Sequence, residues 1–536
     1  MPNFISSKLP LENTGSFEKT IISYINGHNS LKKLYDFEPD LAGLGKRIEA
    51  GSNKELDRAL LVKVLRSQYQ GFDLLPDSPV KINIESFASQ STFSVTTGHQ
   101  LNIFSGPLYV LFKLISTINL SEKLKKEFPE NNFVPVYWMA TEDHDIAEIN
   151  NLNLFSKKFE FETSYKGKSG ELMLNEFVKF KENIFEVLGD SGFAKEIIQL
   201  ISDSYKESND LATATRLWTH NLLGKFGLVV FDADNDELKK LFAPIAEKEL
   251  KEEFVSPSVK KATEILKDEF IVQVNPREIN LFYIHEDTRN RIVRSENSYQ
   301  ILNTELSFTQ TEILAELKLH PERFSPNVLM RPLYQEIILP NLAYIGGPSE
   351  ITYWLELKFV FEKLNLTMPV LLLRNCAMIA ERPSLNKWSK LGFQITDIFR
   401  PENELIREYL DKKEGHFSLK QYSEKISSIF DQITIEISAI DQSLKATAES
   451  EKHKSVNSIS MLEEKVLRAF KRKEEAEINQ IKKIRDKFLP GGVLQERSET
   501  LLPFYMKWGS DFIDDIKKSF DPLDSRFTIF EEKNNF

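Results

Sequence analysis

TTGHQLNIFSGPLY, residues 96–109, and VPVYWMATEDHD, residues 134–145, are the two stretches of sequence that decide the expected fold. Each contains an apolar or β-branched run beside a cluster of polar side chains, and residues 109–128 between them have a helical pattern. In open α/β sheets, ligands bind beyond the carboxyl ends of the strands. We therefore interpret the two stretches as one strand–helix–strand unit that carries chemistry at its strand ends.

The same alternation continues along the chain. Residues 227–234 (GLVVFDAD) and 369–374 (PVLLLR) are typical of buried strands, and residues 237–250 and 350–364 are typical of helices. Short β-rich runs also occur at residues 80–84 and 92–96. Alternating strands and helices predict an α/β fold with a doubly wound parallel sheet of the Rossmann type.

Changes in composition suggest four segments. Apolar residues recur every three or four positions from residue 419 to 488, which predicts two long helices in an antiparallel coiled-coil hairpin with a break near residue 450. Pro490, Gly491 and Gly492 are expected to end the second helix. The expected segments are 1–88, mostly helical and packed on the core; 89–411, the Rossmann-like core with insertions near 155–210 and 251–321; 412–489, the hairpin; and 490–536, which returns to the core.

Composition excludes several classes of protein. The 536 residues carry a formal net charge of −11, which argues against nucleic acid as the main partner because phosphate contacts need a basic surface. Cys376 is the single cysteine, so neither an intramolecular disulfide nor a cysteine-based structural zinc site is expected. We find no run of about 18 apolar residues and no signal-peptide pattern, which predicts a cytoplasmic protein without a membrane partner.

The first polar cluster offers a candidate ligand site. Thr97, Gly98, His99 and Gln100 end a predicted strand, and Asn102 follows. Free backbone N–H groups at such a helix start suit a phosphate or a carboxylate. A helix N-cap with a tight turn explains the same residues equally well.

The second cluster is the stronger candidate. Glu142, Asp143, His144 and Asp145 are four consecutive ionisable residues after an apolar run, and burying all of them would be costly. They are therefore expected to line a wet cleft, where Asp143, His144 or Asp145 could act as a general base. A metal site is the rival interpretation, and a capped helix start is the structural one.

A third group lies between residues 331 and 354. Arg331 follows an apolar run and could clamp a carboxylate through two hydrogen bonds, although a structural salt bridge explains it equally well. Gly346 and Gly347 precede a helix that begins near Glu350, so their backbone amides are candidate donors.

Five blocks of sequence occur together and in a fixed order. They are residues 97–109, residues 138–145, Arg331-Pro332 with Gln335-Glu336, residues 346–354 with Tyr353 and Trp354, and residues 495–497. Together they resemble the BshC family of cysteine-adding enzymes of bacillithiol biosynthesis, over essentially the whole chain.

This resemblance implies a core related to class I aminoacyl-tRNA synthetases, interrupted by connective insertions, and a coiled coil that pairs two subunits as a homodimer. It implies a ligase that forms an amide between the carboxylate of cysteine and the amine of glucosaminyl malate. ATP or ADP, with Mg²⁺, is the implied nucleotide. The implied nucleotide-binding residues are Arg374, Asn375, Pro490, Gly491, Gly492, Gln495, Glu496 and Arg497.

The reaction assigns roles to the candidate residues. The attacking amine must be neutral, so one residue of the 142–145 cluster would act as the base. Arg331 would hold the malate carboxylates, and the amides of Gly98, Gly346 and Gly347 would hold the developing anion. The alternatives are a nucleotide-binding transferase for another amine, a metal-dependent hydrolase centred on residues 142–145, and a coiled-coil scaffold with an inactive Rossmann body.

Overall fold

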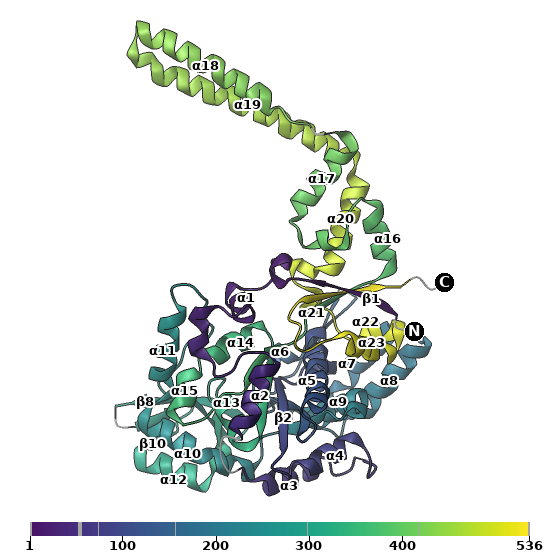
Figure 1. The fold of residues 1–536 in the computed structure, drawn as a ribbon, viewed down its shortest axis with the longest axis vertical. Coiled ribbons are helices and arrows are strands. Elements are labelled where there is room, and N and C mark those ends of the chain that lie inside the picture. Colours follow the sequence, from purple (N-terminus) through teal and green to yellow (C-terminus); the bar gives the residue numbers. More distant parts are fainter. Residues whose placement is uncertain are drawn as a thin grey trace. The chain divides into compact units, whose positions relative to one another are not determined.

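The computed structural model describes residues 3–51, 56–72, 74–155, 157–296, 298–415 and 417–533. The chain forms two compact units, of which one is Met1–Met378 with Leu494–Lys533 and the other is Ile379–Val493 (Figure 1). The boundary falls before the expected change at residue 412. Helices α16 (Arg382–Lys390) and α17 (Glu402–Glu414) belong to the second unit because they pack against its helix α20 (Glu475–Phe488).

A five-stranded parallel sheet forms the centre of the first unit. Its strands are β2 (Thr92–His99), β3 (Asn132–Met139), β6 (Val229–Asp232), β12 (Asn341–Gly346) and β13 (Val370–Leu373), in the spatial order β13-β12-β2-β3-β6. The chain extends the sheet from β2 through β3 to β6, then returns to the other side of β2 with β12. This reversal places a topological switch point between β2 and β12 and confirms the doubly wound α/β core.

Helices bury the sheet, which explains why its strands are apolar along their whole length. Helix α5 (Leu108–Glu127) connects β2 to β3, as the sequence predicts, and packs against both strands. A buried cluster joins α5 and α2 (Leu41–Ala50) to β2, β3, β12 and β13, with Leu44, Phe93, Leu120 and Leu342 among its members. At the sheet edge, the side chain of Gln68 of α3 (Arg58–Gln68) hydrogen bonds to the backbone carbonyl and the backbone N of Asp232. These bonds occupy hydrogen-bonding groups that the edge strand β6 would otherwise leave unpaired.

The expected β-rich run at residues 80–84 is wrong, because these residues form helix α4 (Pro79–Ser86). Oγ of Ser78 accepts a hydrogen bond from the backbone N of Lys81 at 3.4 Å, and Pro79 occupies the first helical position. A serine N-cap followed by proline is a strong helix start. This local signal outweighs the β-branched residues that suggested a strand.

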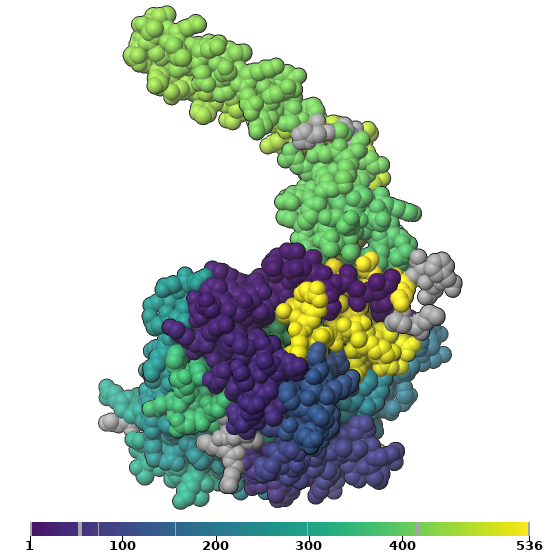
Figure 2. All heavy atoms as spheres, viewed as in Figure 1, coloured from purple at the N-terminus to yellow at the C-terminus, as the bar shows by residue number. Residues whose placement is uncertain are grey.

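The two ends of the first unit meet in a sheet. Strand β1 (Phe4–Leu9) pairs antiparallel with β15 (Phe527–Glu532), in register from Phe4 opposite Glu532 to Leu9 opposite Phe527. Figure 2 shows the N-terminal and C-terminal segments side by side on the surface of this unit. The other elements of these segments are η1 (Leu11–Thr14), α1 (Lys19–Ile25), η2 (Asn29–Leu34), α21 (Gln495–Ser498), α22 (Leu502–Trp508) and α23 (Asp511–Ser519).

The second insertion contains a sheet of its own. Strands β7 (Leu281–His285), β8 (Thr288–Ser295), β9 (Ser298–Ile301), β10 (Ser307–Thr309) and β11 (Phe324–Pro326) lie in the order β10-β9-β8-β7-β11. Each neighbouring pair is antiparallel. Helices α10 (Asp236–Glu252) and α11 (Val255–Leu266) precede this sheet in the chain, and α12 (Gln310–Leu319) and η7 (Pro321–Arg323) lie between β10 and β11.

The remaining elements of the first unit connect these layers. Helix α13 (Arg331–Ile338) leads into β12. The others are η3 (Ile103–Ser105), α6 (Ile146–Ile149), β4 (Asn151–Leu154), β5 (Lys157–Glu160), η4 (Ser169–Glu171), η5 (Leu174–Phe177), α7 (Val178–Leu188), α8 (Gly192–Ser204), α9 (Leu211–Leu223), η6 (Gly224–Phe226), α14 (Pro348–Leu355) and α15 (Lys358–Lys363), with β14 (Ala377–Ala380) at the boundary of the units.

A helical hairpin dominates the second unit. Helices α18 (Lys420–Ile440) and α19 (Lys445–Lys473) pack along each other. The break falls at η9 (Gln442–Leu444) and not near residue 450, because Asp441 caps the turn by accepting a hydrogen bond from the backbone N of Ser443 at 2.8 Å. Two further short helices, η8 (Ile395–Phe399) and η10 (Pro490–Gly492), complete the unit. None of the helices in the described part of the chain is long and apolar enough to cross a membrane.

Candidate active site at the strand ends

A cavity of about 870 Å³ opens beyond the carboxyl ends of β2, β3 and β12, at the topological switch point. This is where open α/β sheets bind their ligands. Six arginines (Arg277, Arg289, Arg291, Arg331, Arg374 and Arg497) and six carboxylates (Glu142, Asp143, Asp145, Glu148, Asp234 and Glu350) are among the described residues that line it. A site with this many charges of both signs suits a polar, multiply charged ligand.

Gly98 ends β2 in the cavity wall and leaves room for two neighbours. A Cβ atom at this position would lie 3.3 Å from the hydroxyl of Tyr344 and 3.4 Å from Nη1 of Arg331. Glycine therefore allows both side chains to approach the end of β2 closely. This is the structural reason for the glycine that the sequence singled out.

Beneath the cavity, Lys113 joins the ends of two strands. Its Nζ donates to the backbone carbonyl of Gly98 at 2.6 Å and to Oε2 of Glu350 at 2.6 Å. The hydroxyl of Tyr344 donates to Oε1 of Glu350 at 2.8 Å, and the backbone N of Gly347 donates to Oε2 at 2.7 Å. Burial by itself would raise the pKa of Glu350, but the Lys113 charge and these hydrogen bonds hold it below its ordinary value.

This arrangement corrects two predicted roles. Both oxygens of Glu350 accept hydrogen bonds from the protein, so Glu350 organises the strand ends at the cavity. The amide of Gly347 is engaged by Glu350 and is not a free donor for a developing anion. Gly346 lies outside the set that lines the cavity, and a Cβ there would lie 2.8 Å from Cδ1 of Ile351.

His99 is a neutral side chain in the cavity wall. Burial lowers its pKa to about 3, and the nearby charges of Lys113 and Arg374 act in the same direction. Its ring packs edge-on against Tyr109 with the centroids 5.4 Å apart. A histidine in this state can donate one hydrogen bond and accept another, but it carries no charge at neutral pH.

Arg331 is held between two aromatic rings, 5.6 Å from the ring of Trp138 and 5.5 Å from that of Tyr344. Its Nη1 donates to Oε1 of Gln335 at 3.0 Å, whereas its buried Nη2 has no hydrogen-bond partner among the described residues. A buried unpaired donor is costly, so Nη2 is a candidate contact for a ligand oxygen. Nη1 uses one of its two N–H groups on Gln335, which orients the guanidinium beneath the cavity.

The residues of the 142–145 cluster differ in whether their side chains have hydrogen-bond or ion-pair partners. Glu142 forms an ion pair with the fully buried Lys239, so its role is structural. Oδ2 of Asp143 accepts a hydrogen bond from Nε2 of Gln100 at 2.6 Å, and the same nitrogen lies 2.7 Å from Oε2 of Glu148. The carboxylate of Asp145 makes no hydrogen bond or ion pair within the described ranges. Asp145 is therefore the open carboxylate of the cluster.

His144 is fixed by a residue that the sequence analysis did not identify. Nη1 of Arg289 lies 3.2 Å from Nδ1 of His144, and the two rings of His144 and Phe282 are 5.7 Å apart. Burial lowers the pKa of His144, and the Arg289 charge lowers it further against the opposing effect of Asp143 and Asp145. Guanidinium can only donate, so Nδ1 accepts and the neutral ring carries its proton on Nε2.

Three other predicted residues are structural. Oγ1 of Thr97 donates to the backbone carbonyl of Ile345 at 2.7 Å and so ties β2 to β12. Trp354 is fully buried and packs on Tyr344 with the ring centroids 4.5 Å apart. These two residues and Asn102 lie outside the set that lines the cavity, whereas Gln100 and Tyr353 line it.

Some of the residues predicted to bind the nucleotide line the cavity, and the others do not. Arg374 and Arg497 line the cavity. Nη2 of Arg374 pairs with Oε1 of the fully buried Glu496 at 2.7 Å, and Nε of Arg374 is buried without a partner among the residues described. Gln495 is buried and lies outside the cavity lining. Pro490, Gly491 and Gly492 belong to the second unit, where they end α20.

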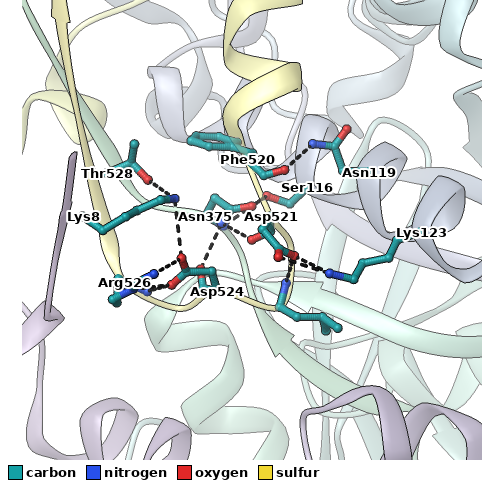
Figure 3. A network of polar contacts seen from close by, with 11 residues as sticks. Lys8, Ser116, Asn119, Lys123, Asn375, Phe520, Asp521, Asp524, Arg526 and Thr528 are labelled. Atoms are coloured by element: carbon teal, nitrogen blue, oxygen red, sulfur yellow. Dashed lines mark hydrogen bonds and ion pairs between the residues drawn. The ribbon is translucent and has the colours of Figure 1, made fainter. Parts of the chain in front are cut away.

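Asn375 has a structural role that Figure 3 makes clear. Its backbone N donates to Oγ of Ser116 at 3.0 Å, and its Nδ2 donates to the backbone carbonyls of Asp521 at 2.7 Å and Asp524 at 3.2 Å. Asn119 reinforces this contact by donating to the carbonyl of Phe520 at 2.8 Å. Asn375 therefore anchors the C-terminal segment to α5, and the prediction that it binds nucleotide loses its support.

The sequence analysis missed the wall that the second insertion contributes. Phe282, Arg289 and Arg291 of the β7–β8 hairpin and Arg277 of the preceding loop line the cavity. A signal was present, because Arg289 and Arg291 are two residues apart in a strand and so share one face. We interpreted this segment as an insertion, and none of its residues was among the predicted site residues.

The fold and the cavity define a Rossmann-type α/β protein with a charged ligand site at its switch point. Two family models match the chain: the Bacillithiol biosynthesis BshC N-terminal Rossmann-like domain over residues 5–375 and the BshC C-terminal coiled-coil domain over residues 377–532. The chain belongs to the BshC family.

Curated relatives agree over nearly the whole length. A Flavobacterium johnsoniae protein named "Putative cysteine ligase BshC" is 40% identical over 97% of this chain and 98% of its own. Proteins of the same name from Christiangramia forsetii and Bacillus cereus are 39% and 28% identical, over 96% and 92% of this chain and 97% and 95% of theirs. A solved arginyl-tRNA synthetase structure from Campylobacter jejuni, covering 90% of this chain and 100% of its own, gives a TM-score of 0.21 at 11% identity, too low to bear on the fold.

Proposed function

We propose that this protein is a cysteine ligase of bacillithiol biosynthesis, which joins the carboxylate of cysteine to the amine of glucosaminyl malate. Full-length relatives named as cysteine ligases support this assignment. The observation that carries it is the cavity at the switch point, which combines an open carboxylate, Asp145, with open guanidinium nitrogens. Amide formation between two charged small molecules needs both kinds of group.

The amine must lose a proton before or during attack on the acyl carbon. We assign this proton to the carboxylate of Asp145, because Glu142 is paired with Lys239 and Asp143 accepts a hydrogen bond from Gln100. His144 carries its proton on Nε2 and therefore acts as a hydrogen-bond donor toward the substrates. The C–N bond forms as the activating group leaves with the electrons of the C–O bond.

A free carboxylate has no adequate leaving group, so ATP is the proposed co-substrate, with Mg²⁺ as its counterion. The cavity fits an anionic nucleotide, because Nη2 of Arg331 and Nε of Arg374 are buried donors without partners among the described residues. Arg374 and Arg497 are the predicted nucleotide residues that line this cavity. When bound, ATP would supply the phosphorus that a cysteine carboxylate oxygen attacks, and pyrophosphate or ADP would be the leaving group.

The hairpin of the second unit supports a homodimer. Tyr422, Ile429, Ile433 and Leu462 are 38 to 53% exposed along α18 and α19. Only Ala448 is buried among the described residues of these two helices. An amphipathic helical hairpin with an open apolar stripe is expected to pack against another such stripe. We propose that a second copy of the chain covers this stripe. We also propose that the protein acts in the cytoplasm.

The direct test is product formation by the purified protein. Cysteine and glucosaminyl malate are incubated with and without ATP and Mg²⁺, and the thiol product is identified by mass spectrometry. We expect the amide only when ATP is present. Product with another amine in place of glucosaminyl malate would favour the related transferase.

The metal-dependent hydrolase has less support, because Glu142 is engaged by Lys239 and no group of three metal-ligating residues occurs within the described residues.

A further inference from the structure

One face of the β7–β8 hairpin forms a cationic wall of the cavity. Arg291 lies opposite Phe282 in the antiparallel register, and Arg289 lies two residues before Arg291 on the same strand. Residues with these relations share one face of a sheet, and positions two apart along a strand are roughly 7 Å apart. All three side chains line the cavity.

The two arginines of this face differ in what holds them. Nε of Arg289 donates to Oγ of Ser325 at 2.9 Å, and its Nη2 donates to the backbone carbonyl of Pro326 at 2.9 Å. Its guanidinium also lies 3.9 Å from the centre of the Phe282 ring. Arg289 is thus fixed by the protein, whereas the guanidinium of Arg291 makes no hydrogen bond or ion pair in the part of the chain described here.

Arg277 presents a second open guanidinium from a fixed backbone. The backbone N of Arg277 donates to Oδ1 of Asn280 at 3.2 Å, and Nδ2 of Asn280 donates to the carbonyl of Arg277 at 2.9 Å. The buried Glu249 holds Asn280 in turn, through a hydrogen bond of 2.8 Å. The Arg277 side chain lines the cavity and has no polar partner among the described residues.

The same loop is fixed at its other end by a buried carboxylate. Oε1 of Glu356 accepts hydrogen bonds from the backbone N of Gln273 at 2.7 Å and of Val274 at 3.3 Å. The loop that carries Arg277 is therefore held on both sides, and ordering it costs little when a ligand binds. A rigid backbone with an unpaired cation on it is the arrangement expected of a site for an anion.

The charges of the cavity wall show which anion fits. Glu142, Asp234 and Glu350 are each neutralised by a lysine that lies outside the cavity lining. Asp143, Asp145 and Glu148 are the cavity carboxylates without a lysine partner, but none of them pairs with Arg277 or Arg291 among the described residues. Guanidinium binds a carboxylate through two parallel hydrogen bonds, so two open groups match a ligand that carries two carboxylates.

We propose that Arg277 and Arg291 are the specificity-determining residues that bind the two carboxylates of the amine acceptor, an inference that rests on the proposed function. The insertion thereby selects an acceptor with a dicarboxylate arm. Arg331, whose Nη2 is a buried donor without a partner among the described residues, is left for the other reactant or the nucleotide. This replaces the predicted assignment of the malate carboxylates to Arg331.

The test measures binding and catalysis separately. Arg277→Gln and Arg291→Gln remove the charge and keep an unbranched polar side chain. Arg294→Gln is the matched control, since Arg294 lies on the same strand, outside the cavity lining, and pairs with Glu253 on the surface. Calorimetry measures the affinity of each protein for glucosaminyl malate and for methyl glucosaminide, which has the amine and no carboxylates, and thermal unfolding checks that each variant is folded.

We expect each cavity variant to bind glucosaminyl malate about 10- to 100-fold more weakly, with methyl glucosaminide changed less than about threefold. The control should match the wild type with both ligands. Equal affinity of all four proteins for glucosaminyl malate, or no binding of it by the wild type, would overturn the proposal. If the cavity variants lose affinity for glucosaminyl malate selectively but the wild type forms no amide, the proposed reaction is wrong and the proposed binding site stands.

Discussion

Nη1 of Arg289 lies 3.2 Å from Nδ1 of His144, which fixes the proton of the neutral imidazole on Nε2. The ring nitrogen that Arg289 leaves free is therefore a donor. This relationship separates His144 from the open carboxylate of Asp145, although the two residues are adjacent in the sequence and the sequence offered both as bases.

A donor role predicts that His144→Gln is a mild change. The glutamine amide also donates a hydrogen bond, so kcat/KM for amide formation should fall by less than about tenfold. His144→Ala should cost more, because the donor is lost. Steady-state kinetics checks both variants, and a loss in His144→Gln as large as that in an Asp145 variant would contradict the donor role.

The base role predicts a larger loss for Asp145→Asn. An amide side chain does not take a proton at neutral pH, so kcat should fall by about 100- to 10,000-fold with little change in KM. Single-turnover measurements of amide formation separate this step from product release. Full activity of Asp145→Asn would remove Asp145 from the reaction.

The ion pair between the buried Lys113 and Glu350 predicts that replacing Lys113 lowers the stability of the fold. Lys113→Met leaves the partly buried Glu350 without its counter-charge, which should lower the free energy of unfolding by about 3 kcal/mol. Lys123→Met on the same helix removes an exposed pair with Asp521 and should cost less than about 1 kcal/mol. Urea denaturation measures both. Adding Glu350→Gln to Lys113→Met should restore part of the loss, and equal effects of the two lysine variants would contradict the account.

Asp232 predicts a pH dependence of stability. Burial raises its pKa to about 6, with the charge of Asp234 acting in the same direction. The folded state therefore holds this proton to higher pH than the unfolded state, so ionisation destabilises the fold as pH rises from about 4 to 6. The difference in unfolding free energy between wild type and Asp232→Asn should shift by about 3 kcal/mol across this window, in favour of the variant at higher pH. Denaturant titrations at several pH values measure it, and a flat difference would be the contrary result.

The exposed apolar stripe predicts how the dimer can be broken. Ile429→Glu with Ile433→Glu places two charges in the stripe and should convert a dimer of this chain to a monomer. Ser428→Glu with Gln432→Glu adds the same charge one position away on the exposed surface and should leave the dimer intact. Sedimentation velocity distinguishes the two. A monomeric wild type would rule out the proposed dimer.

Much of the fold could be predicted because its signals are local and strong. The polar clusters at Thr97–Gln100 and at residues 141–145 do end neighbouring parallel strands, and the helix between them does cross from one to the other. Residues 80–84 were misassigned because their β-branched residues were weighed above the Ser78-Pro79 helix start. The pairing of β1 with β15 joins residues more than 500 positions apart, which no local pattern reports.

The site was less accessible to sequence reasoning, because its chemistry depends on which charges are paired. Glu142 and Asp145 look equivalent in the sequence, yet Lys239, nearly 100 residues later, neutralises one and not the other. Asn375 and Trp354 were identified by their neighbourhood in the sequence, but their side chains face the interior. The cationic wall of the insertion was missed because its arginines meet the cavity only through the antiparallel register of β7 and β8.

The central claim is that this chain forms an amide from a nucleotide-activated carboxylate. Cysteine labelled with ¹⁸O in both carboxylate oxygens tests it most directly, with glucosaminyl malate, ATP and Mg²⁺ present and the products resolved by mass spectrometry. We predict one ¹⁸O atom in the released AMP or phosphate for each amide formed, because the carboxylate oxygen that attacks phosphorus leaves with it. Amide formed without label in AMP or phosphate, or no amide at all, would contradict the account.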